Sequence, residues 1–310
     1  MNRTLHFAFG VNDGYLPYVI VTIKSILENN KDAQCHFHIL TDGISVKNKN
    51  RLAKETHQYS NSKVEYHIVN TILLNGIKST WSVFAWLRIF LPEILSNIDK
   101  VLYLDADIIV NDNLSDLFDM DMTGKSIAAV LDIQNYDINT FIRCGYPKEK
   151  EYICSGVLLM NLDYWRKYNI TEKIIDWSRE NNERIKFPDQ DAINYICRDT
   201  KVLLPLKYGI IDAFFTSDSF VDFGLSSQIK ESFHNPAIIH YAGQSPWIIE
   251  RAKHTLQTYW NNYNHQLIKP IQRKYESKGV ILLKVILWRL LNSGTAQTKY
   301  ATIRNKINSL

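Results

Sequence analysis

Two aspartates separated by one residue follow an apolar run in the stretch KVLYLDADIIV. The run is typical of a buried strand, and Asp105 and Asp107 stand at its end. Like charges this close repel each other, so a folded protein usually keeps such a pair to hold a cation. Carboxylate oxygens select hard cations such as Mg²⁺ or Mn²⁺. The spacing therefore predicts a divalent-cation site, with an acidic turn in solvent as the alternative.

A histidine far along the chain can complete this site. The apolar run PAIIH is predicted to be a last strand that ends in His240, and we expect it at the same sheet edge as the aspartates. An imidazole ligand favours Mn²⁺, with Mg²⁺ as the alternative. Such a site with open coordination positions can share its metal with the oxygens of a diphosphate. Taken alone, His240 would more often be a satisfied core histidine.

The segments that must position these residues alternate between strands and helices. Strands are predicted at LHFAFGV, CHFHILTDG, KVEYHIVN, KVLYL, SIAAVLD and SGVLLMNL, and helices at YLPYVIVTIKSILEN, in a polar stretch ending near His57, at WSVFAWLRIFLPEIL and at FPDQDAINYIC. This order is typical of an α/β protein with a mostly parallel sheet flanked by helices. Ligands bind such sheets at the carboxyl ends of the strands, where the aspartates are expected.

Composition places the chain among ordinary globular proteins. Its 310 residues include 45% hydrophobic and 22% charged residues. The four cysteines form no CxxC or Cys/His cluster, so free and mostly buried thiols in a reducing cytoplasmic compartment are expected. The N-terminus lacks the pattern of a signal peptide. No apolar run reaches the roughly 20 residues that cross a bilayer.

Charge divides the chain into two parts. Residues 269–310 carry nine bases and one acid, whereas residues 1–268 carry 27 bases and 31 acids. We therefore predict a catalytic domain over 1–268 and a basic, amphipathic, membrane-associating C-terminal segment over 269–310. The alternative for the run GVILLKVILWRLL is a helix packed on the core. The net acidic body argues against a nucleic-acid partner.

Four motifs, in the order DKVLYLDADIIV, SGVLLMNLDYW, PDQDAIN and IIHYAGQSPW, resemble the family 8 retaining glycosyltransferases. That family includes galactosyl- and glucosyltransferases of bacterial lipopolysaccharide assembly and, more distantly, glycogenin. The resemblance implies a Rossmann-like GT-A fold, Mn²⁺ and a UDP-hexose donor. It further implies transfer of galactose or glucose to a hydroxyl of a glycan or glycolipid acceptor, by an enzyme on the cytoplasmic face of the inner membrane.

The resemblance also implies roles for single residues. Asp105, Asp107 and His240 match the metal ligands. Arg88 matches an arginine at the donor sugar and diphosphate, and Gln190 matches a residue near the β face of the anomeric carbon. The implied catalytic residues are Arg88, Asp132, Asp189 and Gln190, with Asp132 and Asp189 on the hexose, and the implied nucleotide-binding residues are Gly10, Val11, Asn12, Tyr15, Arg88, Asp105, Ala106 and Gly243. Without the family, Arg88 could pair with a helix acid, and Asp132 or Asp189 could be turn or cap residues.

Three positions depart from the family pattern. Asn12 stands where an aspartate usually meets the uracil, and Cys154 stands where many members have asparagine. The loop HYAGQSPW lacks the usual lysine, so Gln244 or Ser245 is expected to bond the diphosphate instead. These departures leave open a non-catalytic nucleotide-sugar-binding protein. A phosphohydrolase of the haloacid dehalogenase type is the other alternative, although its acidic motif normally follows the first strand.

Overall fold

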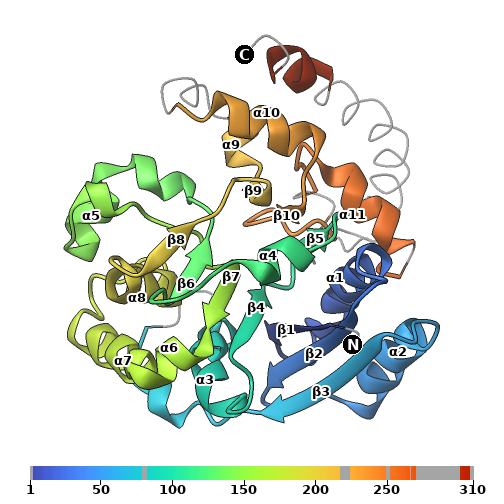
Figure 1. Ribbon diagram of the computed structural model, residues 1–310, viewed down its shortest axis with the longest axis horizontal. Helices are drawn as coiled ribbons and strands as arrows, with labels where there is room; N and C mark the ends of the chain where they lie inside the picture. Colours follow the sequence, from blue (N-terminus) through green and yellow to red (C-terminus); the bar gives the residue numbers. More distant parts are fainter. Residues whose placement is uncertain are drawn as a thin grey trace, which may run out of the picture.

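The computed structural model describes residues 3–78, 82–216, 224–248, 252–265, 267–269 and 301–307. A seven-stranded sheet runs through the middle of this structure (Figure 1). Its strands, in spatial order, are β3 (Ser62–Ile68), β2 (Gln34–Thr41), β1 (Thr4–Gly10), β4 (Lys100–Leu104), β7 (Val157–Asn161), β6 (Ile127–Ala129) and β8 (Lys201–Leu203). Only the two pairings that involve β7 are antiparallel. The mostly parallel α/β sheet predicted from the sequence is confirmed.

Helices cover both faces of this sheet and define two cores. The α-helices are α1 (Leu16–Asn29), α2 (Val46–Thr56), α3 (Leu91–Ile94), α4 (Ser115–Asp119), α5 (Ile138–Cys144), α6 (Leu162–Lys167), α7 (Ile170–Glu180), α8 (Pro188–Cys197), α9 (Ala213–Thr216), α10 (Ser226–His234) and α11 (Gln257–Asn264). Side chains alternate along a strand, so Phe7 and Phe9 join one core with α1. Ala8 joins the other core with α6, α7 and α8. The result is a three-layer arrangement.

The segment 81–95 differs from the single helix expected there. A 3₁₀ helix, η2, spans Val83–Phe90, and only the short α3 follows it. Short 3₁₀ helices also occur as η1 (Ile72–Leu74), η3 (Ile133–Tyr136) and η4 (Lys148–Lys150). Within η2 the Arg88 Nε donates to the Ala85 carbonyl at 2.7 Å. A methyl group placed on Gly10 would lie 2.3 Å from the Phe84 carbonyl, so η2 packs directly on the end of β1. We attribute the tighter helix to these tertiary contacts, which outweigh the local helical pattern.

A second, three-stranded sheet carries the late histidine. It consists of β5 (Ile108–Val110), β10 (Ile238–His240) and β9 (Tyr208–Ile211), in that order. The prediction of a strand that ends in His240 is confirmed, but its placement in the same sheet as the aspartates' strand was wrong, because β10 belongs to the second sheet. The chain leaves β4 at Asp105, and β5 then pairs antiparallel with β10, so that His240 lies opposite Ile108. The Tyr241 N–H also donates to the Asp107 carbonyl at 2.9 Å. The expected proximity of aspartates and histidine comes from this pairing.

The described end of the chain packs on the body. Residues 301–307 form a helix, which Figure 1 draws near α10. Ile303 and Ile307 are buried in the same core cluster as Ile229 and Phe233 of α10. The predicted membrane-associating run GVILLKVILWRLL lies outside the described residues, and the boundary at residue 268 stays a prediction. Within the described ranges, no helix combines the length and apolar character that a membrane crossing needs.

Candidate active site

Three ligand-type side chains converge where the two sheets meet. His240 Nε2 lies 3.4 Å from Asp107 Oδ1 and 3.8 Å from Asp105 Oδ2. One ligand atom from each of the three residues falls within 4.8 Å of the others. A Cβ atom at Gly156 would lie 2.3 Å from His240 Cε1 and 2.8 Å from Asp105 Oδ2. Only glycine therefore leaves room for these groups to come together.

Two carboxylates and one imidazole form a donor set that suits Mn²⁺ or Mg²⁺. Asp105 and Asp107 keep 30% and 20% of their side-chain surface exposed, whereas His240 keeps 5%. The open side of the set is thus its carboxylate side, where an ion could also accept ligand oxygens. Cys154 Sγ lies 3.6 Å from His240 Nδ1, on the other nitrogen of the ring. That contact turns Nε2 toward the carboxylates. The residues present fit a divalent cation.

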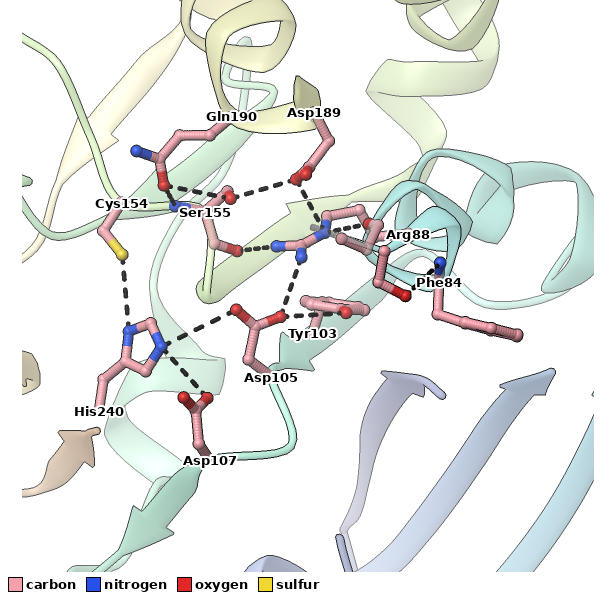
Figure 2. A network of polar contacts seen from close by, with 12 residues as sticks. Phe84, Arg88, Tyr103, Asp105, Asp107, Cys154, Ser155, Asp189, Gln190 and His240 are labelled. Atoms are coloured by element: carbon pink, nitrogen blue, oxygen red, sulfur yellow. Dashed lines mark hydrogen bonds and ion pairs between the residues drawn. The ribbon is translucent and has the colours of Figure 1, made fainter. Parts of the chain in front are cut away.

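Arg88 links this cluster to Asp189 of α8 (Figure 2). The side chain is buried, with 1% of the residue exposed. Its Nη2 donates to Asp105 Oδ1 at 2.9 Å, and its Nε lies 3.2 Å from Asp189 Oδ2. Nη1 donates to the Ser155 carbonyl. One guanidinium therefore fixes a predicted metal ligand and a predicted sugar-binding acid at the same time.

The network continues from Asp189 to Gln190 and Asp132. Ser155 Oγ donates to Asp189 at 3.2 Å, and the Ser155 N–H donates to Gln190 Oε1 at 2.8 Å. Gln190 Nε2 in turn donates to Asp132 Oδ2 at 3.3 Å. The other Asp132 oxygen accepts the Gln134 N–H at 2.8 Å, which caps η3. The four residues proposed as catalytic from the sequence thus belong to one network, which contacts the proposed metal ligands through the ion pair of Arg88 with Asp105.

Burial and charge set the ionisation of these groups. Burial opposes the charged form of Arg88, but Asp105 and Asp189 raise its pKa above the ordinary value. Burial raises the pKa of Asp189, an effect that Arg88 partly offsets. Burial likewise raises the pKa of Asp132. Burial opposes the protonated form of His240, but the Asp107 carboxylate raises its pKa well above the ordinary value. A bound cation would take the place of that proton.

Sequence reasoning missed the residues that hold this network from behind. Tyr103 donates to Asp105 Oδ1 at 3.2 Å, and the Arg88 guanidinium lies 4.1 Å from its ring centre. Tyr152 OH donates to Asp191 at 2.6 Å and accepts from Gln190 Nε2 at 3.3 Å. Asp191 stands in the quoted PDQD motif, so its position in the motif was the available signal. Tyr103 lies in the apolar run of the motif DKVLYLDADIIV, and Tyr152 directly follows the charged residues 148–151. No local pattern separates either of them from an ordinary core residue.

Three of the residues predicted to meet the nucleotide, Val11, Asn12 and Tyr15, directly follow β1, which ends at Gly10. Val11 is buried and its N–H donates to the Leu40 carbonyl at 2.9 Å, while Asn12 Oδ1 accepts the Tyr15 N–H at 3.0 Å. The Asn12 side-chain oxygen therefore accepts a hydrogen bond from the residue that precedes α1. Tyr15 is 48% exposed and makes an edge contact with Trp247 of the HYAGQSPW loop. Tyr18 stacks on the same indole with ring centres 3.8 Å apart. The first and last predicted donor loops thus lie side by side.

The HYAGQSPW loop is fixed by a buried acid. Gln244 Nε2 donates to Asp212 Oδ2 at 2.8 Å, while Asp212 Oδ1 accepts the Thr255 N–H at 2.6 Å. We expected the Gln244 amide to bond a diphosphate in place of lysine. In the structure its nitrogen donates to Asp212 and holds the loop instead. Gly243 has φ +73°, a left-handed conformation that favours glycine, and Ser245 has φ +44°. Ala106 lies between the two aspartates on the loop that leaves β4.

Comparisons with known proteins match this chain to one family. The model of glycosyl transferase family 8 matches residues 6–249. Lipopolysaccharide 1,2-glucosyltransferase of Escherichia coli (strain K12) is 28% identical over 260 residues, covering 79% of this chain and 73% of that protein. Lipopolysaccharide 1,3-galactosyltransferase of Salmonella typhimurium is 27% identical over 256 residues, covering 78% and 72%.

A solved structure gives the same result for the fold. The galactosyltransferase LgtC, solved in complex with donor and acceptor sugar analogs, superposes with a TM-score of 0.75 at 24% identity. The superposition covers 87% of this chain and 99% of LgtC. The GT-A fold predicted from the sequence is confirmed.

Proposed function

Because the chain belongs to glycosyl transferase family 8, we propose that it transfers galactose or glucose from a UDP-sugar to a hydroxyl of a glycan, with retention of configuration. Glycosyltransferase activity follows from membership of this family. The sugar donor, the stereochemistry and the metal are our proposal. The observation that supports it is the unbroken set of contacts from His240 and Asp107 through Asp105 and Arg88 to Asp189. This set joins a cation site to acids suited to bind hydroxyl groups.

A divalent cation held by Asp105, Asp107 and His240 would neutralise charge on a departing diphosphate. The chain's own residues supply the rest. Arg88 is held by two carboxylates beside the cation site, and its fixed positive charge stabilises a state in which negative charge grows on the leaving group. Such preorganised charge accelerates the reaction only where the transition state is more charged than the bound substrate. Breaking the bond to a diphosphate oxygen meets this condition.

Gln190 has a supporting electrostatic role in this account. An amide is a poor nucleophile, and its Oε1 already accepts from the Ser155 N–H at 2.8 Å. Asp189 and Asp132 are the carboxylates available to the hexose or, if a covalent intermediate forms, to the anomeric carbon. Asp189 is the better anion of the two because Arg88 lies 3.2 Å away. We assign sugar hydroxyl binding to both.

The acceptor is proposed to be a growing lipopolysaccharide or other surface glycan. The two named bacterial relatives act on lipopolysaccharide, and the segment 269–310 carries nine bases against one acid. Basic residues near an anionic surface contribute about 1 kcal/mol each to membrane binding. We therefore place the enzyme on the cytoplasmic face of the inner membrane as a peripheral protein.

Membrane binding is best tested by changing charge and keeping the chain whole. Truncation at residue 268 would also remove the buried Ile303 and Ile307. Replacing Lys278, Lys284 and Arg289 with glutamine leaves that packing in place. We expect the variant to sediment less with anionic vesicles than the native chain, and equal sedimentation would contradict the membrane assignment.

Donor and stereochemistry are tested together. The chain is incubated with Mn²⁺, a lipopolysaccharide core acceptor and each of UDP-galactose, UDP-glucose and UDP-N-acetylglucosamine. We expect transfer from one of the first two, and proton NMR of the product should show an α linkage from the α-linked donor. A β-linked product would contradict retention, and transfer of N-acetylglucosamine alone would contradict the hexose.

A further inference from the structure

Four histidines and a glutamate gather on one face of the sheet, on strands β1, β2 and β3. His6 lies on β1 and is paired in register with His36 of β2. His38 of β2 is paired with Glu65 of the edge strand β3, and His67 follows Glu65 by two residues on the same face. None of these residues belongs to the site described above. The cluster lies on the β1 side of β4, away from β7.

The ring nitrogens lie close enough to share one ion. His6 Nδ1 is 3.1 Å from His38 Nε2, and the rings of His36 and His38 have centres 4.2 Å apart. One ligand atom each from His6, His36 and His38 fall within 4.8 Å of one another. Tetrahedral zinc with bonds of about 2.0–2.1 Å needs ligand atoms roughly 3.3 Å apart. The nitrogens of His6 and His38, 3.1 Å apart, are already close to that separation.

The other two groups of the cluster, His67 and Glu65, lie beside the second ring nitrogen of His38. Its Nδ1 lies 3.1 Å from His67 Nε2 and 3.8 Å from Glu65 Oε2. A metal-binding histidine usually donates its second ring N–H to such a partner, which fixes the ring and its tautomer. Glu65 Oε1 also lies 3.3 Å from His36 Nε2 and 2.6 Å from Lys63 Nζ. Lys63 is thus a cation beside the cluster, and its side chain is 65% exposed to solvent.

We propose that His6, His36 and His38 form a second metal site, which binds one late transition-metal ion of the Zn²⁺ class, with Glu65 and His67 supporting His38. Three imidazole nitrogens select Zn²⁺, Ni²⁺ or Cu²⁺ over Mg²⁺, Mn²⁺ or Ca²⁺, in contrast to the carboxylate-rich site at Asp105. The ion would tie β1 to β2 directly, and through Glu65 and His67 to the edge strand. The site is therefore structural.

The test uses the untagged, full-length chain carrying Asp107→Asn, which weakens the other cation site. Zinc is titrated calorimetrically into this background and into the same chain with His6→Gln and His36→Gln. His57→Gln, an exposed histidine on the surface after α2, is the matched control. We expect one tight zinc ion in the background and in the control, and loss of that ion in the double variant. Equal zinc binding in all three chains, or none in the background, overturns the proposal.

A second readout identifies the ligands. Cobalt(II) in a four-coordinate nitrogen site absorbs strongly in the visible region, whereas six-coordinate oxygen sites absorb weakly. We expect the strong spectrum in the background chain and its disappearance in the His6→Gln, His36→Gln variant. These two residues are chosen because His38 is only 1% exposed and its replacement could disturb folding. A weak, oxygen-type spectrum in the background chain would contradict the three-histidine assignment.

Discussion

Arg88 is the residue on which the two halves of the catalytic site depend. Its guanidinium contacts Asp105, Asp189 and the Ser155 carbonyl, all from a buried position. A planar group with five donors can meet these acceptors together, whereas an ammonium group cannot. The charge of Arg88 and the shape of its side chain therefore make separate contributions.

Replacing Arg88 with lysine tests the contribution of shape. We expect Arg88→Lys to lower kcat by roughly 10²-fold, the usual effect of removing one preorganised donor. The matched control is Arg166→Lys, because Arg166 donates to three backbone carbonyls and, unlike Arg88, lies outside the site. The control should lose stability with kcat unchanged. Similar kcat values for both variants would show that Arg88 acts only in folding.

At the level of secondary structure, the site depends on contacts between elements that are distant in sequence. Helix α8 presents Asp189 and Gln190, and Tyr152 before β7 fixes Gln190 from behind. Tyr152 is fully buried and also donates to Asp191. Its hydroxyl thus positions Gln190, although no motif in the sequence links the two residues.

Removal of that hydroxyl should separate positioning from binding. In Tyr152→Phe, the buried Asp191 and the Gln190 amide lose a partner, so we expect a stability loss of about 1–3 kcal/mol. We also expect kcat to fall while KM for the donor changes little. Tyr146→Phe is the control, because the Tyr146 hydroxyl donates to the Glu151 carbonyl at 3.2 Å and makes no hydrogen bond with Gln190. Denaturant unfolding and initial rates would check both, and an unaltered kcat would exclude the positioning role.

The contact between η2 and β1 gives a prediction for a glycine. A Cβ atom at Gly10 would lie 2.3 Å from the Phe84 carbonyl, whereas at Gly14 the nearest atom is 3.4 Å away. We expect Gly10→Ala to destabilise the fold by about 1–3 kcal/mol, and Gly14→Ala to have little effect. Thermal unfolding of the two variants would show this. A stable Gly10→Ala variant would mean that η2 can shift away from the strand.

Local patterns in the sequence predicted most elements but could not predict how distant ones meet. The strands KVLYL and SGVLLMNL and the helix FPDQDAINYIC are where their patterns placed them, because apolar periodicity and Pro188 act locally. The second sheet depends on pairing between residues 108–110 and 238–240, which no local pattern encodes. The site residues were identified because they stand in motifs that occur in the order typical of the family. The roles of Tyr103 and Tyr152 were missed because only their contacts in the folded structure reveal them.

For the molecule as a whole, the chain's end joins the body. Ile307 is completely buried in the core cluster that also contains α1 and α10 residues. The basic segment 269–310, which we propose to meet a membrane, therefore contains a helix, residues 301–307, that is anchored on the catalytic domain.

This anchoring predicts a large stability effect at the far end of the chain. Ile307→Asp would bury an unpaired charge and leave a cavity, so we expect a loss of at least about 3 kcal/mol in the free energy of unfolding. Asn305→Asp, at an exposed position of the same helix, should change it little. Urea denaturation of the full-length variants measures both. Equal midpoints would show that residues 301–307 do not contribute to the folded core.

The proposed sugar transfer depends on one cation site acting on one diphosphate. The decisive measurement is UDP release from the preferred UDP-hexose, with Mn²⁺ and with EDTA, in the native chain, in Asp107→Asn and in Asp112→Asn. Asp112 is an exposed aspartate five residues further on and serves as the matched control. We predict metal-dependent UDP release by the native and control chains, and a loss of roughly 10²-fold or more in Asp107→Asn. Release that survives EDTA and Asp107→Asn, or release of inorganic phosphate instead of UDP, would contradict the account.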